Sequence, residues 1–369
     1  MKKKTFIVFL IIFLLSIFNA TAQEDENIIQ IAILLDTSNS MDGLIDQAKS
    51  QLWKIVNELA ISKKNGKSLR IEVALFEYGN NYLKPEEGYI RMVSPLTTDL
   101  DLISDQLFKL KTNGGLEYCG WVIQEATEKL KWHKSNNVLK LIFIAGNEPF
   151  DQGDVKYQES CKNAISKGII VNTIFCGSYQ EGVATFWKRG ADLADGKYVN
   201  IDQSKKYEYV ETPYDNEIAS LNEELNKTYI AYGSQGKEKK IMQERQDQNA
   251  KTMNRESEIQ RTITKSQKQY ANSEWDLVDA VKEKEIDINN IDEKDLPEEM
   301  RKMSKEDRKK YIENMIKKRE EIQKKILELN DKRNNYLIER KKQDSKNESL
   351  DSAIIKIIKD QAIKKNYQF

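Results

Sequence analysis

Three oxygen-bearing side chains follow one apolar run at alternating positions. Asp36, Ser38 and Ser40 form a D-x-S-x-S pattern directly after the apolar residues 29–35. A carboxylate and two hydroxyls are hard oxygen ligands that suit Mg²⁺ and leave coordination positions for water or an acidic ligand. Asp and Ser are common residues, so the triplet alone is a weak signal. Its place after a strand strengthens it, because open α/β sheets bind ligands beyond the carboxyl ends of their strands.

Two further segments offer oxygen donors that could join this group. Glu117 follows the paired glycines Gly114 and Gly115, and Asn147 and Glu148 follow the apolar run 138–145. Glu117 also has a purely structural interpretation, because an acid in the first turn of a helix is favoured by the helix dipole.

Other chemistries lack their residues. His133 is the only histidine, so zinc sites of the Cys/His type and Ser-His-Asp or Cys-His catalysis have little to build on. The P-loop, H-E-x-x-H and G-x-S-x-G patterns are absent from the sequence. Lys plus Arg and Asp plus Glu balance at 59 each, which gives no basic surface for nucleic acid. We therefore expect neither an enzyme nor a nucleic-acid-binding protein.

The elements that position these residues alternate between apolar runs and amphipathic runs. This rhythm predicts βαβ units and a mostly parallel sheet with helices on both faces. The second and third strands follow each other without a helix, so we expect an antiparallel pair at an edge. The predicted strands are 29–35, 69–76, 89–96, 138–145, 169–176 and 197–201, and the predicted helices are 44–59, 100–111, 119–133, 154–167, 182–194 and 215–226.

With this order of elements and the D-x-S-x-S motif, the segment 27–226 resembles the von Willebrand factor type A (vWA) domain. The resemblance implies a doubly wound, mostly parallel six-stranded α/β domain at residues 24–230. It also implies Mg²⁺ or another divalent cation in a metal-ion-dependent adhesion site, to which a protein partner docks. Asp36, Ser38 and Ser40 match the first ligand motif of the family residue by residue.

The later ligand positions depart from the family pattern. Leu116 stands where the family has a metal-binding threonine, and Gly146 stands where it has an aspartate. Two interpretations follow: a rearranged ligand set that includes Glu117 holds the metal, or the site has lost its metal and recognises a partner by other contacts. We expect Asn39, Asn147 and Glu148 to contact the partner.

The first residues have the composition of a signal peptide. Three lysines precede an apolar run from Phe6 to Phe18, and Ala20 and Ala22 provide the small residues of a cleavage site. We expect residues 1–22 to be removed, no membrane-spanning segment after cleavage, and a secreted or periplasmic protein. Export makes a disulfide possible, and we expect Cys161 to pair with Cys176; the alternative is three buried thiols with Cys119.

The remaining segment, 237–369, has no glycine and is rich in Lys, Glu, Asp, Asn and Gln. Its patterns predict helices at 237–281, 305–342 and 350–363, with a break at 289–297. Within 305–342, Ile312, Met315, Ile322, Ile326 and Leu329 form a heptad seam that Arg319 and Arg333 interrupt. The region is therefore predicted to be a charged, partly coiled-coil helical region, packed as a hairpin or exposed as a single helix, with the last segment folding back on the rest of it.

These features support two functions of different kinds. The first is an exported vWA-domain binding protein that docks a protein partner through a modified metal-ion site. The second is a structural scaffold of the cell envelope, in which the helical region self-associates and the metal site is vestigial.

Overall fold

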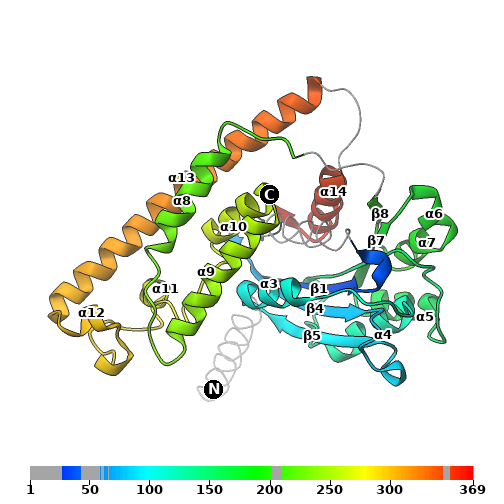
Figure 1. Ribbon diagram of the computed structural model, residues 1–369, viewed down its shortest axis with the longest axis horizontal. Helices are drawn as coiled ribbons and strands as arrows, with labels where there is room; N and C mark the ends of the chain where they lie inside the picture. Colours follow the sequence, from blue (N-terminus) through cyan, green and yellow to red (C-terminus); the bar gives the residue numbers. More distant parts are fainter. Residues whose placement is uncertain are drawn as a thin grey trace, which may run out of the picture.

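The computed structural model describes residues 27–42, 59, 62–64, 66–201, 209–343 and 350–368. Its centre is a six-stranded sheet in the order β5-β4-β1-β6-β7-β8 (Figure 1). Every neighbouring pair is parallel except β4 and β5, which confirms the predicted antiparallel edge pair. The strands are β1 (Ile28–Asp36), β4 (Arg70–Tyr78), β5 (Ile90–Thr97), β6 (Leu139–Gly146), β7 (Ile169–Cys176) and β8 (Tyr198–Ile201).

The direction of winding reverses at β1. From this strand the chain continues to β4 on one side and later to β6 on the other, so the carboxyl end of β1 is the switch point of the sheet. All nine residues of β1 are buried, because helices or loops cover both faces. Asp36 is the last residue of this strand, which places the D-x-S-x-S motif where a doubly wound sheet binds ligands.

Five described helices follow the strands of the sheet. They are α3 (Leu100–Lys109), α4 (Cys119–Lys129), α5 (Tyr157–Ser166), α6 (Tyr179–Ala184) and α7 (Trp187–Asp192). The single helix predicted over 182–194 is two helices, because Phe186 adopts a left-handed backbone conformation with φ 70° between them. The predicted signal peptide and the predicted helix 44–59, apart from Leu59, lie outside the described residues.

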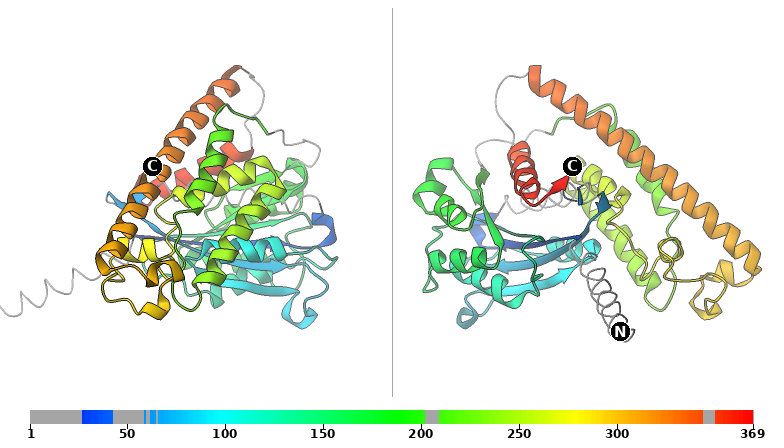
Figure 2. Two further views of the ribbon diagram at one scale, coloured as in Figure 1. Left: turned by 60° about the vertical axis from the view of Figure 1, so that its left-hand side comes forward. Right: turned by 180° about the vertical axis from the view of Figure 1, so that it is seen from behind.

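The segment after the sheet is a packed helical region. Its helices are α8 (Asp215–Asn226), α9 (Gly236–Met253), α10 (Arg255–Ser266), α11 (Leu277–Lys282), α12 (Glu298–Arg301) and α13 (Lys305–Gln343), and a short 3-10 turn, η3 (Glu293–Asp295), precedes α12. A further 3-10 turn, η2 (Pro85–Glu87), belongs to the sheet domain. The long helix α13 lies along α8 and contacts α10 and α11 (Figures 1 and 2). The heptad seam of α13 is thus buried inside the chain.

The two arginines that interrupt the seam are buried with acids. Arg319 Nη1 lies 2.5 Å from Asp276 Oδ2 and 2.6 Å from Asp279 Oδ1, and its guanidinium also covers the ring of Tyr229. Arg333 Nε donates to Asp215 Oδ1 at 3.0 Å, at the first residue of α8. Each arginine therefore pairs with one or two acids from another part of the chain. These ion pairs explain why two charged residues interrupt the apolar heptad seam of α13.

The C-terminal segment returns to the sheet domain, so the prediction that it folds back on the tail was wrong. Helix α14 (Leu350–Ile363) contacts β8, and Gln361 exchanges hydrogen bonds with Asn172 of β7. Strand β9 (Tyr367–Gln368) pairs with β2 (Lys63–Lys64), which also pairs with β3 (Lys67–Ser68). The hydroxyl of Tyr367 donates to the carbonyl of Ile28 and accepts from the amide of Leu139.

A buried polar network joins the sheet domain to the helical region. Arg261 of α10 pairs with Asp101 of α3 at 2.5 Å and with Asp247 of α9 at 2.9 Å. Tyr270 donates to Asp101 at 2.5 Å. Buried charges are stable only when paired, so these contacts define one arrangement of the two parts. None of the helices in the described ranges has the length and apolar character that crossing a membrane requires.

The predicted disulfide between Cys161 and Cys176 is wrong for this structure. Cys161 belongs to the core beneath α4 and α5, whereas Cys176 belongs to the core on the other face of the sheet. The three cysteines are buried thiols instead. Burial raises the pKa of the Cys161 thiol to about 12, which makes it a poor nucleophile.

Candidate functional site

The D-x-S-x-S side chains converge at the carboxyl end of β1, as the sequence predicts. The Ser38 backbone N–H donates to Asp36 Oδ1 at 2.7 Å, and the Ser38 hydroxyl donates to Asp36 Oδ2 at 3.1 Å. The hydroxyls of Ser38 and Ser40 lie 2.7 Å apart. Ser38 precedes a short 3-10 turn, η1 (Asn39–Met41), which carries Ser40 back over the strand end. Asp36 and Ser38 are buried, and Ser40 is exposed to solvent.

Glu117 joins this group from the loop before α4. The Ser40 hydroxyl donates to Glu117 Oε1 at 3.4 Å, and the backbone N–H of Glu148 donates to Glu117 Oε2 at 3.2 Å. The Glu117 backbone N–H donates to Gln152 Oε1 at 3.3 Å. Glu117 is 1% exposed, so it is not simply a solvated acid that interacts with the dipole of the following helix. We call Asp36, Ser38, Ser40 and Glu117 the oxygen cluster.

The oxygen cluster holds two buried acids close together. Burial, then repulsion by Glu117 and a hydrogen bond with it, raise the pKa of Asp36 well above its usual range. Burial also raises the pKa of Glu117. Within the part of the chain that the structure describes, neither carboxylate is paired with a lysine or an arginine. Two buried carboxyl groups that lie close together cannot both stay ionised without compensation, so they favour either a shared proton or a bound metal ion.

Two glycines allow the carboxylates to approach. Gly79 follows β4 with φ +77°, and a Cβ atom there would lie 2.6 Å from Asp36 Oδ1 and 2.9 Å from Glu117 Cγ. A Cβ atom on Gly115 would lie 2.3 Å from the carbonyl oxygen of Gly79. The backbones of the two loops therefore touch, and this contact brings Glu117 over the end of β1. The paired glycines mark this loop in the sequence, but the role of Gly79 was not predicted.

The structure shows what fills the space at position 146, where the resemblance to the family leads us to expect an aspartate. A Cβ atom on Gly146 would lie 2.5 Å from the Tyr78 hydroxyl, 3.0 Å from Trp187 Cη2 and 3.2 Å from Asp36 Cβ. Tyr78 donates to the carbonyl of Ala145 at 3.0 Å, and the Trp187 indole donates to the carbonyl of Glu148 at 2.8 Å. Two aromatic side chains thus occupy the space that a larger residue would need. Sequence reasoning missed both, because their positions depend on the packing of distant strands.

The donor set fits a divalent cation of the Mg²⁺ type. Neighbouring ligands of an octahedral magnesium ion lie about 3 Å apart. The oxygen pairs Ser38–Ser40 and Ser38–Asp36 are 2.7 and 3.1 Å apart, which is close to this spacing. The described residues contain no metal-ligand cluster made of three or more His, Cys, Asp or Glu side chains. The fit therefore rests on two carboxylates supplemented by hydroxyls, and Leu116, 49% exposed beside them, contributes no ligand.

The residues expected to contact a partner surround the oxygen cluster. Asn147 Oδ1 accepts from the Ser40 hydroxyl at 2.9 Å, so it directly adjoins the cluster. Asn39 is exposed on η1. The Glu148 carboxylate is half-buried and accepts from Gln152 Nε2 at 3.3 Å. The structure thus brings all three to the same edge of the sheet as the cluster, with Asn39 the most accessible.

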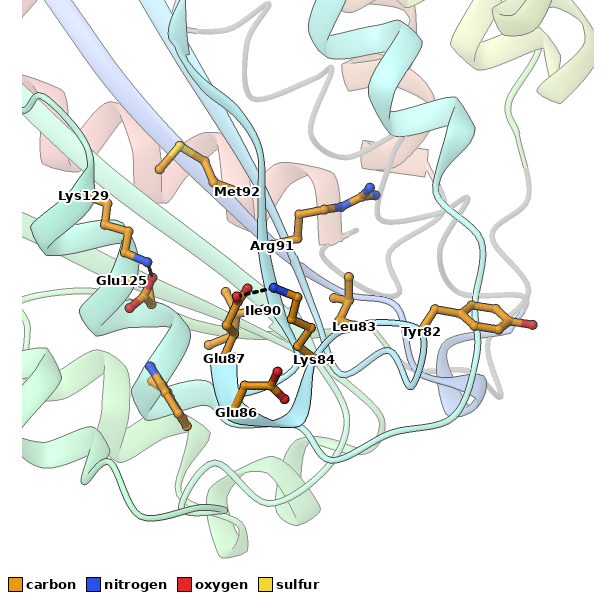
Figure 3. A pocket seen from close by; sticks show the side chains of 11 residues that line it. Tyr82, Leu83, Lys84, Glu86, Glu87, Ile90, Arg91, Met92, Glu125 and Lys129 are labelled. Atoms are coloured by element: carbon orange, nitrogen blue, oxygen red, sulfur yellow. Dashed lines mark hydrogen bonds and ion pairs between the residues drawn. The ribbon is translucent and has the colours of Figure 1, made fainter.

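A separate hollow of about 500 Å³ lies beside the edge strand β5 and helix α4 (Figure 3). Its cations are each paired with an acid: Lys84 with Glu87 at 2.8 Å, Arg91 with Glu77 at 2.6 Å, and Lys129 with Glu125. Because these charges are already paired, the hollow does not indicate a charged ligand. It is distinct from the oxygen cluster, whose residues do not line it.

Comparisons with solved structures show only distant likeness. BatB from Bacteroides thetaiotaomicron is 18% identical, with 47% of this chain and 90% of that chain covered and a TM-score of 0.36. The SpRpn10 VWA domain is 17% identical, with 48% and 90% covered and a TM-score of 0.37. Proximal thread matrix protein 1 from the mussel byssus, solved with a zinc-occupied MIDAS motif, is 13% identical, with 48% and 42% covered and a TM-score of 0.34.

No curated protein sequence matches the chain. The sequence of the sheet domain does match a family model. Residues 30–185 match the model of the von Willebrand factor type A domain, a span that begins in β1 and ends after α6, and that contains the whole oxygen cluster. Together with the strand order and the place of the D-x-S-x-S motif, this match shows that the chain contains a von Willebrand factor type A domain.

Proposed function

We propose that the vWA domain docks an acidic protein partner through a divalent cation held by Asp36, Ser38, Ser40 and Glu117. The proposal rests on the two buried acids Asp36 and Glu117 at the switch point of the sheet, which no lysine or arginine of the described residues neutralises. Such a pair is costly for folding unless something positive binds there. A divalent cation would compensate both charges and present an open position for a carboxylate of the partner.

The surroundings of the cluster support docking rather than catalysis. Ser40 and Asn39 are exposed, so a partner can reach the cation from the side of η1. Leu116 adds an exposed apolar side chain from the neighbouring loop. We expect the partner to place an acidic side chain at the cation, with Asn39, Asn147 and Glu148 in the polar contacts and Leu116 in the apolar ones. We also infer from residues 1–22 that the protein acts in the periplasm or outside the cell.

Titration of the mature chain, residues 23–369, with Mg²⁺ or Mn²⁺ in a calorimeter tests the metal half of the proposal. We expect one binding event that Asp36→Ala abolishes and that Glu117→Gln weakens by at least about tenfold, because each removes a ligand charge. Asp151→Asn is the matched control, since Asp151 is an exposed acid on the loop after β6 and outside the cluster. Absence of heat at millimolar ion in the wild type would refute metal-dependent docking.

Self-association of the helical region as a scaffold is the alternative function. The apolar seam of α13 is occupied by α8, α10 and α11, which leaves its outer face charged. We therefore expect the mature chain to be monomeric in size-exclusion chromatography with light scattering. A stable dimer that persists in the Asp36→Ala variant would favour the scaffold instead.

A further inference from the structure

Three helices bring a lysine, an aspartate and two asparagines together in the helical region. Lys265 of α10 donates through Nζ to Asp247 Oδ2 of α9 at 2.6 Å. The same Nζ donates to the side-chain oxygens of Asn222, at 2.9 Å, and of Asn226, its closer contact, both on α8. Asn222 and Asn226 are four residues apart and so lie on one face of α8.

Asp247 contacts every nitrogen in this group. Its Oδ2 also accepts from the amide nitrogen of Asn226 at 2.8 Å and from that of Asn222 at 3.0 Å. Its Oδ1 accepts from Arg261 Nε at 2.9 Å, which orients the carboxylate. One carboxylate oxygen therefore touches both the amine and the amide nitrogens, the position that a proton carrier between them would need.

The environment of Lys265 favours a reactive amine. Lys265 is 0% exposed, and its Nζ lies 5.7 Å from the centre of the Tyr229 ring. Burial lowers the pKa of Lys265 to about 8, with Asp247 acting in the opposite direction. Burial therefore makes this amine lose a proton more readily than an exposed lysine does.

We propose that Lys265 and Asn226 form an intramolecular isopeptide bond, with Asp247 as the proton carrier. The Lys265 amine attacks Asn226 Cγ, and Asp247 accepts a proton from Nζ as the new C–N bond forms. Asp247 then returns the proton to Asn226 Nδ2, the bond from Cγ to Nδ2 breaks, and ammonia leaves. An amine and a carboxamide become a secondary amide and ammonia, so no oxidant or reductant is needed.

Two observations favour Asn226 over Asn222 as the partner. Asn226 is the last residue of α8, so its backbone has fewer helical hydrogen bonds to lose when the side chain shifts. Both of its polar atoms also make the shorter contacts, with Lys265 and with Asp247. The reacting groups are held in place by packing, which supplies the orientation that such intramolecular reactions require.

The bond would tie the end of α8 to α10 and so fasten two helices of the helical region to each other. None of the three cysteines supplies such a cross-link, since all are thiols. The proposed bond is independent of the oxygen cluster, which lies on the vWA domain. Its test can therefore fail or succeed without affecting the docking proposal.

Mass spectrometry of the mature chain under denaturing conditions tests the proposal directly. We expect a mass lower than that of the sequence by one ammonia molecule. Trypsin should then yield a branched peptide that joins residues 207–227 to residues 262–268, because cleavage after Lys265 is blocked. A chain at its full sequence mass, with both peptides linear, overturns the proposal.

Variants assign the two ends of the bond. Lys265→Arg keeps the positive charge but removes the amine, and Asn226→Ala removes the acceptor, so both should show the full sequence mass. Asn222→Ala is the matched control on the same face of α8 and should still lose ammonia. Loss of ammonia in Asn226→Ala, or its absence in Asn222→Ala alone, contradicts the assignment, and the wild-type measurement remains decisive if any variant fails to fold.

Discussion

At the scale of single residues, the main feature of the oxygen cluster is that Glu117 is its second acid, beside Asp36. Leu116 and Gly146 stand where the resemblance leads us to expect two ligands, and Glu117 lies in the cluster as a buried acid. The sequence predicted which three residues gather at the end of β1, because the D-x-S-x-S spacing acts locally. The burial of Glu117 could not be predicted, since it depends on the contact between Gly115 and Gly79 from two separate loops.

The paired carboxyls predict a characteristic pH dependence of stability. Their folded-state pKa values are raised, so their stabilising contribution is complete below about pH 4, the usual carboxyl pKa, and is lost as pH rises through the raised values. We expect the melting temperature in EDTA to fall over this window, and Mg²⁺ to suppress the fall. Scanning calorimetry of the wild type and of Asp36→Asn checks this, because the melting temperature of the variant in EDTA should depend much less on pH. Identical pH profiles in both proteins would contradict it.

Gly79→Ala should damage the cluster and the fold together. The added methyl group meets Asp36 Oδ1 and Glu117 Cγ, and the backbone at φ +77° disfavours any residue with a side chain. We expect a loss of about 1–3 kcal/mol in the free energy of unfolding and weakened Mn²⁺ binding. Urea titration and calorimetry measure the two effects. Gly233→Ala is the control for backbone strain alone, since it has φ +70° but nothing within 4 Å of the added atom.

At the scale of elements, most of the sheet and helix pattern could be read from the sequence. β7, α8 and α14 begin and end where hydrophobic periodicity predicts, because apolar spacing decides burial locally. The division of one predicted helix into α6 and α7 was missed, since Phe186 has a conformation that periodicity does not reveal. The three-stranded sheet of β2, β3 and β9 was also missed, because it joins two-residue strands from distant parts of the chain.

Replacing a buried arginine of α13 by an apolar residue should destabilise the protein, whereas the heptad pattern alone would predict stabilisation. Arg319→Leu completes the apolar seam, but it leaves Asp276 and Asp279 buried without their cation. Breaking a buried ion pair on one side costs about 3–5 kcal/mol. We therefore expect a destabilised protein in urea titration.

Lys318→Ala serves as the control for that experiment. Lys318 is the neighbouring residue, and its contact with Glu224 at 3.5 Å is half-exposed. Its loss should change stability little, since exposed ion pairs contribute about 0–1 kcal/mol. Equal stability of Arg319→Leu and Lys318→Ala would show that the acids are not held by the arginine.

At the scale of the whole molecule, the helical region is a partner of the sheet domain rather than a free tail. The composition of residues 237–369 predicted helices, but it gave no sign of where they dock. Docking depends on pairs such as Arg261 with Asp101, whose members are far apart in the sequence and individually look like surface residues. Composition reports average exposure, whereas a buried ion pair is a property of two particular positions.

Truncation after Ile230 should expose this docking surface. Ile103 and Leu107 of α3 belong to the same core as Ile259 and Ile263 of α10. Asp101 would also lose Arg261. We expect residues 23–230 to be poorly soluble or to bind a hydrophobic dye, in contrast to the mature chain. A soluble, cooperatively melting fragment would show that the sheet domain folds alone.

We propose that Glu117 and the D-x-S-x-S residues form one cation site. Crystals of the mature chain grown with Mn²⁺, and measured for anomalous scattering, test it most directly. We predict an anomalous peak within coordination distance of Asp36 and Glu117, about 2–2.3 Å from their oxygens, and no such peak in Asp36→Ala crystals. Density that shows the two carboxyls hydrogen bonded to each other at millimolar Mn²⁺, with no peak between them, would contradict the account.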